Sequence, residues 1–174
     1  RVAQKFGAKV PFMRSAETSS DYATTIDVLK EVILEYKKIG REFENLCCIY
    51  PCVPFLKAET LKDAWKKYKG HVSLTPVCRY DAPIEWAMRI ENGILVPNDR
   101  EAQNIRSQDI EPKYFDAGMF YFYKTQVSLA ETGLNPKGTV AYIIDRLQCQ
   151  DIDTIEDWEI AEAKYRCFMQ KLDL

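Results

Sequence analysis

Two aspartates stand one residue apart near the C-terminal end of the chain, in the stretch QDIDT. In an extended segment residues i and i+2 point to the same side, so Asp151 and Asp153 can face one point while Ile152 faces the core. Two hard oxygen ligands with room for water and phosphate oxygens are how Mg²⁺ is usually held. Aspartates before a helix also act as caps, and residues 154–157 nearly form a capping box. Spacing alone favours the cap.

Other polar side chains form weaker candidates for a binding site. Arg14 follows an apolar run, and its guanidinium could fork onto a phosphate or carboxylate, although most exposed arginines are simply solvated. The stretch NIRSQD contains Arg106 and Gln108 and suits recognition of a polyhydroxylated acid, with a solvated loop as an equal alternative. Asp116 stands just before Gly118, where glycine permits close approach of a ligand, or it simply ends the loop.

Several well-known catalytic and metal-binding patterns do not occur in the sequence. There is no GxSxG, HExxH, GxGxxG or GxxxxGK[ST] stretch, and none of the six cysteines forms a CxxC. The single histidine, His71, cannot complete an ordinary zinc set, and we interpret it as structural. Free cysteines are typical of a cytosolic protein.

Composition limits the class of protein. The chain has 174 residues, 47% of them apolar and 29% charged, as expected for one soluble globular domain. The 24 basic and 26 acidic residues are interspersed and give a net charge of -2, which argues against a nucleic-acid partner. No apolar run approaches the ~20 residues of a membrane span, and no signal peptide is evident. We expect a cytoplasmic protein without membrane contact.

The elements that must position these residues follow from hydrophobic spacing. Residues 21–40 predict a helix capped by Asp21, residues 43–50 a buried strand, residues 58–69 a helix and residues 72–77 a strand. Strand, helix and strand joined by short connections indicate a mostly parallel sheet in an α/β sandwich. The pair Asn92-Gly93 predicts the turn of a projecting β-hairpin, and the polar residues 98–113 predict a long loop. After this loop we expect strands at residues 117–123 and 140–144 and a last helix at residues 155–171.

The beginning of the sequence is unusual for a nucleotide-binding fold. Residues 1–6 predict the end of a helix and residues 8–12 a strand, so the chain reads as starting within a domain. Such folds normally open with a strand and its phosphate-binding turn. We therefore expect that an N-terminal piece is missing.

Six stretches in register resemble one enzyme family. They resemble the sugar-acid cytidylyltransferases, which activate sialic-acid-like nonulosonic acids with CTP, and the resemblance covers essentially the whole chain. RSQD, YxDAGxFY and Tyr50 are more similar to the pseudaminic acid branch than to the N-acetylneuraminate branch, which typically has Gln in place of Tyr50. Pro51-Cys52-Val53 and Met119 depart from the family pattern. The matching stretches are GAKVPFMR, TIDV, IYPCVPF, NIRSQD, YFDAGMFY and QDIDT with EDW.

The resemblance implies a fold and a set of site residues. It implies a single domain over residues 1–174, a three-layer, Rossmann-like nucleotidyltransferase sandwich with a mostly parallel sheet, and a hairpin region at about 80–125 that contributes to a homodimer and to the sugar-acid site. It also implies Mg²⁺ and CTP. The implied roles are metal binding and catalysis for Asp151 and Asp153, nucleotide binding for Arg14 and Thr25, sugar-acid binding for Tyr50, Arg106, Gln108 and Asp116, and a catalytic role for Arg106 as well.

The reaction expected from this resemblance is transfer of CMP from CTP to the anomeric hydroxyl of a nonulosonic acid, with release of pyrophosphate. Pseudaminic acid is the favoured acceptor, N-acetylneuraminate and legionaminate are alternatives, and the general base is open. A further alternative is a catalytically incomplete fragment that acts at most as a binding module. It arises because the family's Arg-, Ser- and Lys-containing loop, which cradles the triphosphate, does not precede Arg1.

Overall fold

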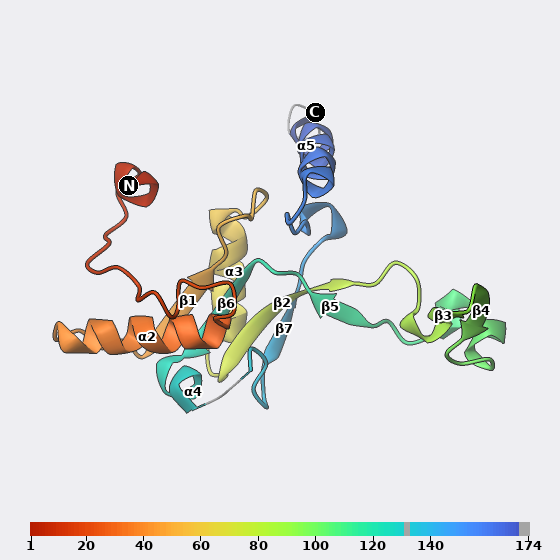
Figure 1. Ribbon diagram of the computed structural model, residues 1–174, viewed down its shortest axis with the longest axis horizontal. Helices are drawn as coiled ribbons and strands as arrows, with labels where there is room; N and C mark the ends of the chain where they lie inside the picture. Colours follow the sequence, from red (N-terminus) through yellow and green to blue (C-terminus); the bar gives the residue numbers. More distant parts are fainter. Residues whose placement is uncertain (131–132, 171–174) are drawn as a thin grey trace. The chain divides into compact units, whose positions relative to one another are not determined.

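The computed structural model describes the backbone of residues 1–130 and 133–170, with side chains up to residue 167 (Figure 1). Its α-helices are α1 (Val2–Lys5), α2 (Thr25–Lys38), α3 (Ala58–Tyr68), α4 (Thr125–Ala130) and α5 (Ile155–Gln170). Its strands are β1 (Asn45–Ile49), β2 (Ser73–Arg79), β3 (Met88–Glu91), β4 (Ile94–Pro97), β5 (Tyr114–Asp116), β6 (Phe120–Lys124) and β7 (Val140–Ile143). Single 3₁₀ turns occur at Ile84–Trp86, Ala102–Asn104, Ser107–Asp109 and Arg146–Gln148.

The main sheet is antiparallel, with strand order β1-β6-β2-β5, and β7 also pairs with β2. β2 runs antiparallel to β5, with Cys78 opposite Phe115, and antiparallel to β6, with Leu74 opposite Phe122. The fold is α/β, but the prediction of a mostly parallel, Rossmann-like sandwich is wrong. The prediction fails because β6 lies between β1 and β2, so the two strands that flank α3 are not neighbours in the sheet.

The predicted hairpin is confirmed. β3 and β4 form a separate two-stranded antiparallel sheet, with Arg89 opposite Val96 and Glu91 opposite Ile94. Asn92 and Gly93 make the turn, with φ of 50° and 81° respectively. Positive φ at both positions is the requirement of a type I′ turn, and Asn-Gly is the pair that meets it at least cost.

The predicted helix before β1 begins later than its sequence pattern indicates. Thr24, and not Asp21, is the N-cap of α2: its hydroxyl accepts the backbone N–H of Asp27, and the Asp27 carboxylate accepts the N–H of Thr24. These bonds satisfy N–H groups that otherwise have no partner in the first turn. The strand expected at residues 8–12 is also wrong, because these residues adopt no regular structure.

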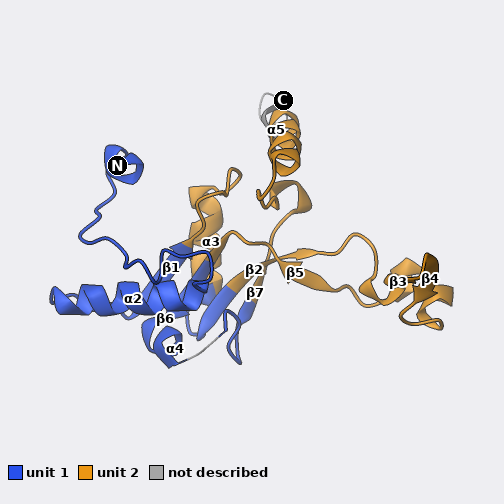
Figure 2. Cartoon of the chain, viewed as in Figure 1, with its two compact units in different colours: residues 1–48, 68–74, 121–140 blue, residues 49–67, 75–120, 141–174 orange. Residues whose placement is uncertain are grey.

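The chain divides into two compact units, coloured separately in Figure 2. The first comprises Arg1–Cys48, Tyr68–Leu74 and Tyr121–Val140. Its core includes Tyr68, whose ring stacks on Phe122 at 5.4 Å and whose hydroxyl donates to Asn45 Oδ1 at 2.6 Å. Tyr123 is buried and donates to the carbonyl of Leu134 at 2.8 Å. The buried tyrosines therefore keep hydrogen-bond partners, as burial of a hydroxyl requires.

The second unit comprises Ile49–Lys67, Thr75–Phe120 and Ala141–Leu174. Its buried side chains include Phe55, Cys78, Met119 and Phe120. The ring of Phe120 packs at 6.2 Å from that of Tyr142, a separation typical of aromatic pairs. This unit carries the QDIDT stretch, the NIRSQD loop and the strands that lead to both.

Candidate functional site

The start of α5 is capped by residues that follow the aspartate pair. Asp157 Oδ2 accepts the backbone N–H of Thr154 at 2.9 Å and its hydroxyl at 2.7 Å, and Thr154 Oγ1 accepts the backbone N–H of Asp157 at 3.2 Å. These bonds hold the pKa of Asp157 below its usual value. The capping box is thus made by Thr154 and Asp157, as predicted for Thr154. The simplest alternative to metal binding, that the preceding aspartates cap the helix, loses its basis.

The residues of the aspartate pair alternate as expected for an extended segment. Asp151 and Asp153 are exposed, whereas Ile152 between them is half-buried. Ile152 lines a shallow apolar pocket of about 360 Å³ together with Pro54, Trp158 and other residues of α5. Packing of Ile152 therefore fixes the segment while leaving both carboxylates accessible to solvent and to a ligand.

Gly118 lies against the carboxylate of Asp151. A Cβ at position 118 would be 3.5 Å from Asp151 Oδ2, and Gly118 has a φ of 61°, a conformation that other residues rarely adopt. The backbone N–H of Gly118 donates to Asp116 Oδ1 at 3.0 Å. The predicted sugar-acid residue Asp116 and the predicted metal ligand Asp151 are therefore both close to one glycine.

The backbone just before Asp151 is held by α5. Lys164 Nζ donates to the carbonyl of Cys149 at 2.8 Å. Burial raises the pKa of Cys149 to about 12, and the neighbouring thiol of Cys78 contributes to this rise. The thiol of Cys149 is therefore favoured in its neutral form. Sequence analysis missed Lys164, because its spacing on the helix does not indicate a backbone partner.

The predicted sugar-acid residues occupy distinct positions in the second unit. The half-buried Tyr50 donates its backbone N–H to the carbonyl of Met119, next to Gly118, at 2.9 Å. Arg106 is exposed, and its Nε pairs with Asp109 Oδ2 at 2.8 Å within the same loop. Gln108 lines a pocket of about 190 Å³ with Arg79, Lys113 and others. Tyr50 is thus tied to the segment around Asp116, whereas Arg106 and Gln108 belong to the long loop.

The pocket beside Gln108 adds cationic side chains that sequence analysis did not single out. Lys113 Nζ pairs with Glu111 at 3.1 Å, and Arg79 lies in the register pair with Tyr114. Neither residue stands in a recognisable motif. Lys113 ends the loop, and the antiparallel pairing of β2 with β5 brings Arg79 beside it, so the signal could not be found without the correct sheet.

The two predicted nucleotide residues lie in the first unit. Arg14 is exposed and donates from Nη1 to the carbonyl of Thr18 at 3.1 Å. Thr25 is the first residue of α2, directly after the Thr24 cap, and it is half-buried. Arg14 therefore belongs to a loop that closes on itself, and Thr25 lies at a helix N-terminus.

The aspartate pair fits Mg²⁺ by its donor chemistry. Within residues 1–130 and 133–170 no group of three or more His, Cys, Asp or Glu side chains forms a complete metal site. Mg²⁺ is nevertheless commonly bound by one or two carboxylates, with waters and substrate phosphates completing the octahedron. Asp151 and Asp153 supply two exposed carboxylates, and Gly118 leaves space beside the first. The residues present are therefore compatible with a metal shared with a phosphate ligand.

The helices that the structure describes include none with the length and apolar character needed to cross a membrane. No protein-family model matches the chain.

Comparison with characterised proteins identifies relatives that align over most of the sequence. Pseudaminic acid cytidylyltransferases from two Campylobacter jejuni strains are 33% and 32% identical to the chain over 168 residues, which are 95% of the chain and 72% of each relative. The CMP-N,N'-diacetyllegionaminic acid synthase of Legionella pneumophila is 24% identical over 173 residues, 92% of the chain and 71% of that protein. The resemblance drawn from the six stretches is confirmed. The chain belongs to the family of sugar-acid cytidylyltransferases that includes the pseudaminic acid enzymes.

Proposed function

We propose that this protein transfers a cytidylyl group from CTP to the anomeric hydroxyl of a nonulosonic acid and releases pyrophosphate. The observation that carries the proposal is the 33% identity to a pseudaminic acid cytidylyltransferase over 95% of the chain. The exposed carboxylates of Asp151 and Asp153, with the helix cap assigned to other residues, agree with it. Pseudaminic acid is the favoured acceptor, because the most similar of the relatives compared act on that acid by name.

In this transfer the protein mainly positions the reactants and neutralises charge, and it contributes little covalent chemistry. The attacking hydroxyl must lie in line with the leaving pyrophosphate, and charge on the α-phosphate must be neutralised. We propose that Asp151 and Asp153 hold Mg²⁺, which when bound supplies that positive charge to the phosphate oxygens. The carboxylate of Asp151 is kept accessible by Gly118 and its backbone is held in place through Lys164 and Cys149.

The remaining proposed roles follow from side-chain chemistry. Arg14 and Thr25 bind the nucleotide, and Arg106 receives the carboxylate of the sugar acid as a bidentate donor. Because Arg106 is paired with Asp109 in an exposed loop, binding an acid exchanges one carboxylate for another at little cost. Tyr50, Gln108 and Asp116 complete the sugar-acid side. Gly118 donates its backbone N–H to Asp116 and lies beside the carboxylate of Asp151, which supports placing the sugar acid near the proposed metal site.

We also propose that the protein acts as a homodimer through the β3–β4 hairpin. Met88, Ile90 and Leu95 share one face of this hairpin and are 52%, 73% and 62% exposed. A two-stranded hairpin is marginally stable without further packing, and apolar patches on a surface commonly mark an interface. Sedimentation velocity over a range of concentrations tests this, and a monomer that is fully active at all concentrations would contradict it.

The function is tested by incubating the purified protein with CTP, Mg²⁺ and each of three acids, namely pseudaminic, N,N'-diacetyllegionaminic and N-acetylneuraminic acid. Mass spectrometry detects the CMP-linked product and a coupled assay detects pyrophosphate. We expect product with all components present and the highest kcat/KM with pseudaminic acid. A preference for the legionaminic acid would favour the second candidate, to which the Legionella relative points. No product with any acid would overturn the proposed function.

A further inference from the structure

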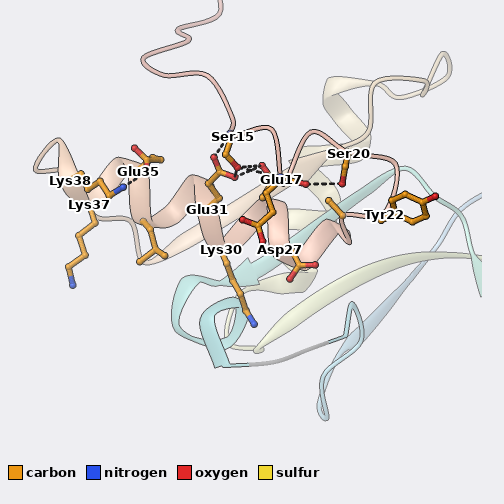
Figure 3. A pocket seen from close by; sticks show the side chains of 13 residues that line it. Ser15, Glu17, Ser20, Tyr22, Asp27, Lys30, Glu31, Glu35, Lys37 and Lys38 are labelled. Carbon is orange, nitrogen blue, oxygen red and sulfur yellow. Dashed lines mark hydrogen bonds and ion pairs between the residues drawn. The ribbon is translucent and has the colours of Figure 1, made fainter.

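The loop that carries Arg14 is fastened to α2 by one carboxylate. Glu31, in the second turn of α2, accepts the backbone N–H of Ser15 at 2.6 Å and the Ser15 hydroxyl at 3.0 Å. The hydroxyl of Thr18 donates to the same carboxylate in a short hydrogen bond. Figure 3 shows Glu31 and Ser15 turned toward each other across the pocket that the loop and the helix enclose. Three donors of one loop thus converge on a single side chain 13 to 16 residues further along the chain.

Arg14 is connected to Glu31 through Thr18. The guanidinium of Arg14 donates to the carbonyl of Thr18, and the hydroxyl of Thr18 donates to Glu31. The Thr18 backbone N–H also donates to Ser15 Oγ at 3.3 Å, which closes the turn between these residues. The bond to Thr18 uses Nη1 of Arg14, and the guanidinium carries further N–H donors that a ligand could accept. The direction of Arg14 therefore depends on the position of Thr18.

The charge of Glu31 strengthens this fastening. Hydrogen bonds to an ionised acceptor are shorter and about twice as strong as those between neutral groups. The bond from Thr18, then the bonds from Ser15, lower the pKa of Glu31, and the positive charge of Arg14 contributes in the same direction. These contacts therefore favour the ionised form of Glu31, which accepts all three hydrogen bonds from the loop.

Other acidic residues near the pocket make different contacts. Glu35, one turn further along α2, pairs with Lys38 of the same helix, and Asp27 takes part in the N-cap of the helix with Thr24. Among the described residues of α2, Glu31 is the acidic side chain whose hydrogen bonds hold the loop. The chain thus offers a matched control in Glu35, which shares the helix and the charge.

We propose that Glu31 is a positioning residue for nucleotide binding, which orients Arg14 by fixing Ser15 and Thr18 against α2. The proposal rests on the proposed function, because it takes Arg14 to bind CTP. Glu31 itself does not touch the nucleotide. We expect its effect on the affinity for CTP and not on that for the sugar acid, because its hydrogen bonds go to the loop of Arg14.

The first test is steady-state kinetics of Glu31→Ala and Glu31→Gln with CTP and the sugar acid varied separately. We expect the KM for CTP to rise about tenfold in Glu31→Ala, in line with the loss of charge-assisted bonds, while the KM for the acid stays the same. Glu31→Gln keeps one acceptor oxygen and is expected to recover part of the loss. Glu35→Gln should leave both KM values unchanged. An equal rise in both KM values, or the same rise in Glu35→Gln, would overturn the proposal.

The second test is a double-mutant cycle with Arg14→Ala. If Glu31 acts through Arg14, the double variant has the same KM for CTP as Arg14→Ala alone, whereas independent roles give multiplied effects. If the increases in KM for CTP of the two single variants multiply in the double variant, the proposal is contradicted. It is also contradicted if KM for CTP is raised in Glu31→Ala but unchanged in Arg14→Ala. Thr18→Val keeps the charge of Glu31 and the size of the side chain but removes one of its three hydrogen bonds, so it should reproduce part of the change in Glu31→Ala. Melting temperatures confirm that each variant is folded.

Failure of the proposed function can be told apart from failure of this inference. Absence of turnover with every acid would contradict the proposed reaction. Calorimetry of CTP binding in the presence of Mg²⁺ tests the nucleotide site alone and needs no acid. We expect Kd for CTP to rise about tenfold in Glu31→Ala and not in Glu35→Gln, whether or not an acid acceptor is found. Equal Kd values in the wild type and Glu31→Ala would sink the proposal.

Discussion

Gly118 and Asp151 lie so close that a methyl group on the glycine would be 3.5 Å from Oδ2 of the carboxylate. The two residues are 33 positions apart in the sequence, and the contact follows from the placement of the β5–β6 connection beside the segment before α5. A carboxylate that is to share a cation with a phosphate needs space on its free side. Gly118 provides that space, and its positive φ makes the position unsuitable for other residues.

Gly118→Ala is expected to lower activity because its methyl group would fill space beside the Asp151 carboxylate, in van der Waals contact with it. The left-handed conformation costs an alanine about 1 kcal/mol, which a thermal melt will detect as a small loss of stability. The methyl group narrows access to the carboxylate, so the Mg²⁺ concentration that gives half-maximal activity should rise several-fold. Gly70→Ala is the matched control, because Gly70 has a φ of 89° with no atom within 4 Å of the added Cβ. If both variants need the same Mg²⁺ concentration, the proposed metal site is not at Asp151.

Asp153→Asn is expected to reduce kcat by at least about a hundredfold at low Mg²⁺, because it removes a charged ligand and with it charge neutralisation at the phosphate. The folded state should change little, since α5 is capped by Thr154 and Asp157. Circular dichroism and a melting curve check this. Full activity of Asp153→Asn at low Mg²⁺ would remove Asp153 from the metal site.

Arg106→Lys is expected to raise the KM for the sugar acid about tenfold, because lysine retains the charge but loses the bidentate geometry. The KM for CTP should not change. Arg166→Lys serves as the control, since Arg166 is also exposed and paired with a carboxylate, that of Glu162 on the same helix. The proposed role is contradicted by a variant whose KM rises for CTP and not for the acid.

The stability of the protein should depend on Asp157 in acid. Hydrogen bonds from Thr154 and from the backbone of Asp153 hold the pKa of Asp157 below its unfolded value of 3.8. A carboxylate with a lowered pKa stabilises the folded state above the unfolded pKa, and this contribution is lost as the pH falls below 3.8 through the folded pKa. Urea unfolding between pH 7 and pH 3 should therefore show a shallower loss of stability for Asp157→Asn than for the wild type. Parallel curves would contradict this reading of the cap.

Elements that depend on neighbours in the sequence could be predicted from it. The helix predicted at residues 58–69 corresponds to α3, and the Asn-Gly turn gave the β3–β4 hairpin, because periodicity and turn chemistry are local properties. The direction of the main sheet could not be predicted. The direction of the sheet depends on β6, which begins about 45 residues after β2 begins and lies between β1 and β2 in the sheet. No local pattern in the sequence indicates that pairing.

The candidate site likewise contains features that the sequence predicts and features that it does not. The exposure of Asp151 and Asp153 on either side of the half-buried Ile152 follows from strand-like alternation, and it was predicted. The contribution of Glu31 and Lys164 was missed, because each acts on the backbone or hydroxyl of residues 13 to 16 positions away. Such contacts depend on how a loop folds back on a helix, which composition and spacing do not determine.

The separation of the cap of α5 from the aspartate pair also affects how members of this family could diverge. A gene copy that replaced both aspartates would lose the proposed catalytic metal while Thr154 and Asp157 still started the helix. Replacement of both aspartates would therefore leave the N-terminal cap of α5 intact in a folded, inactive descendant. In a genome that carries several copies of the enzyme, preservation of the threonine–aspartate cap without the preceding aspartates would mark a pseudoenzyme.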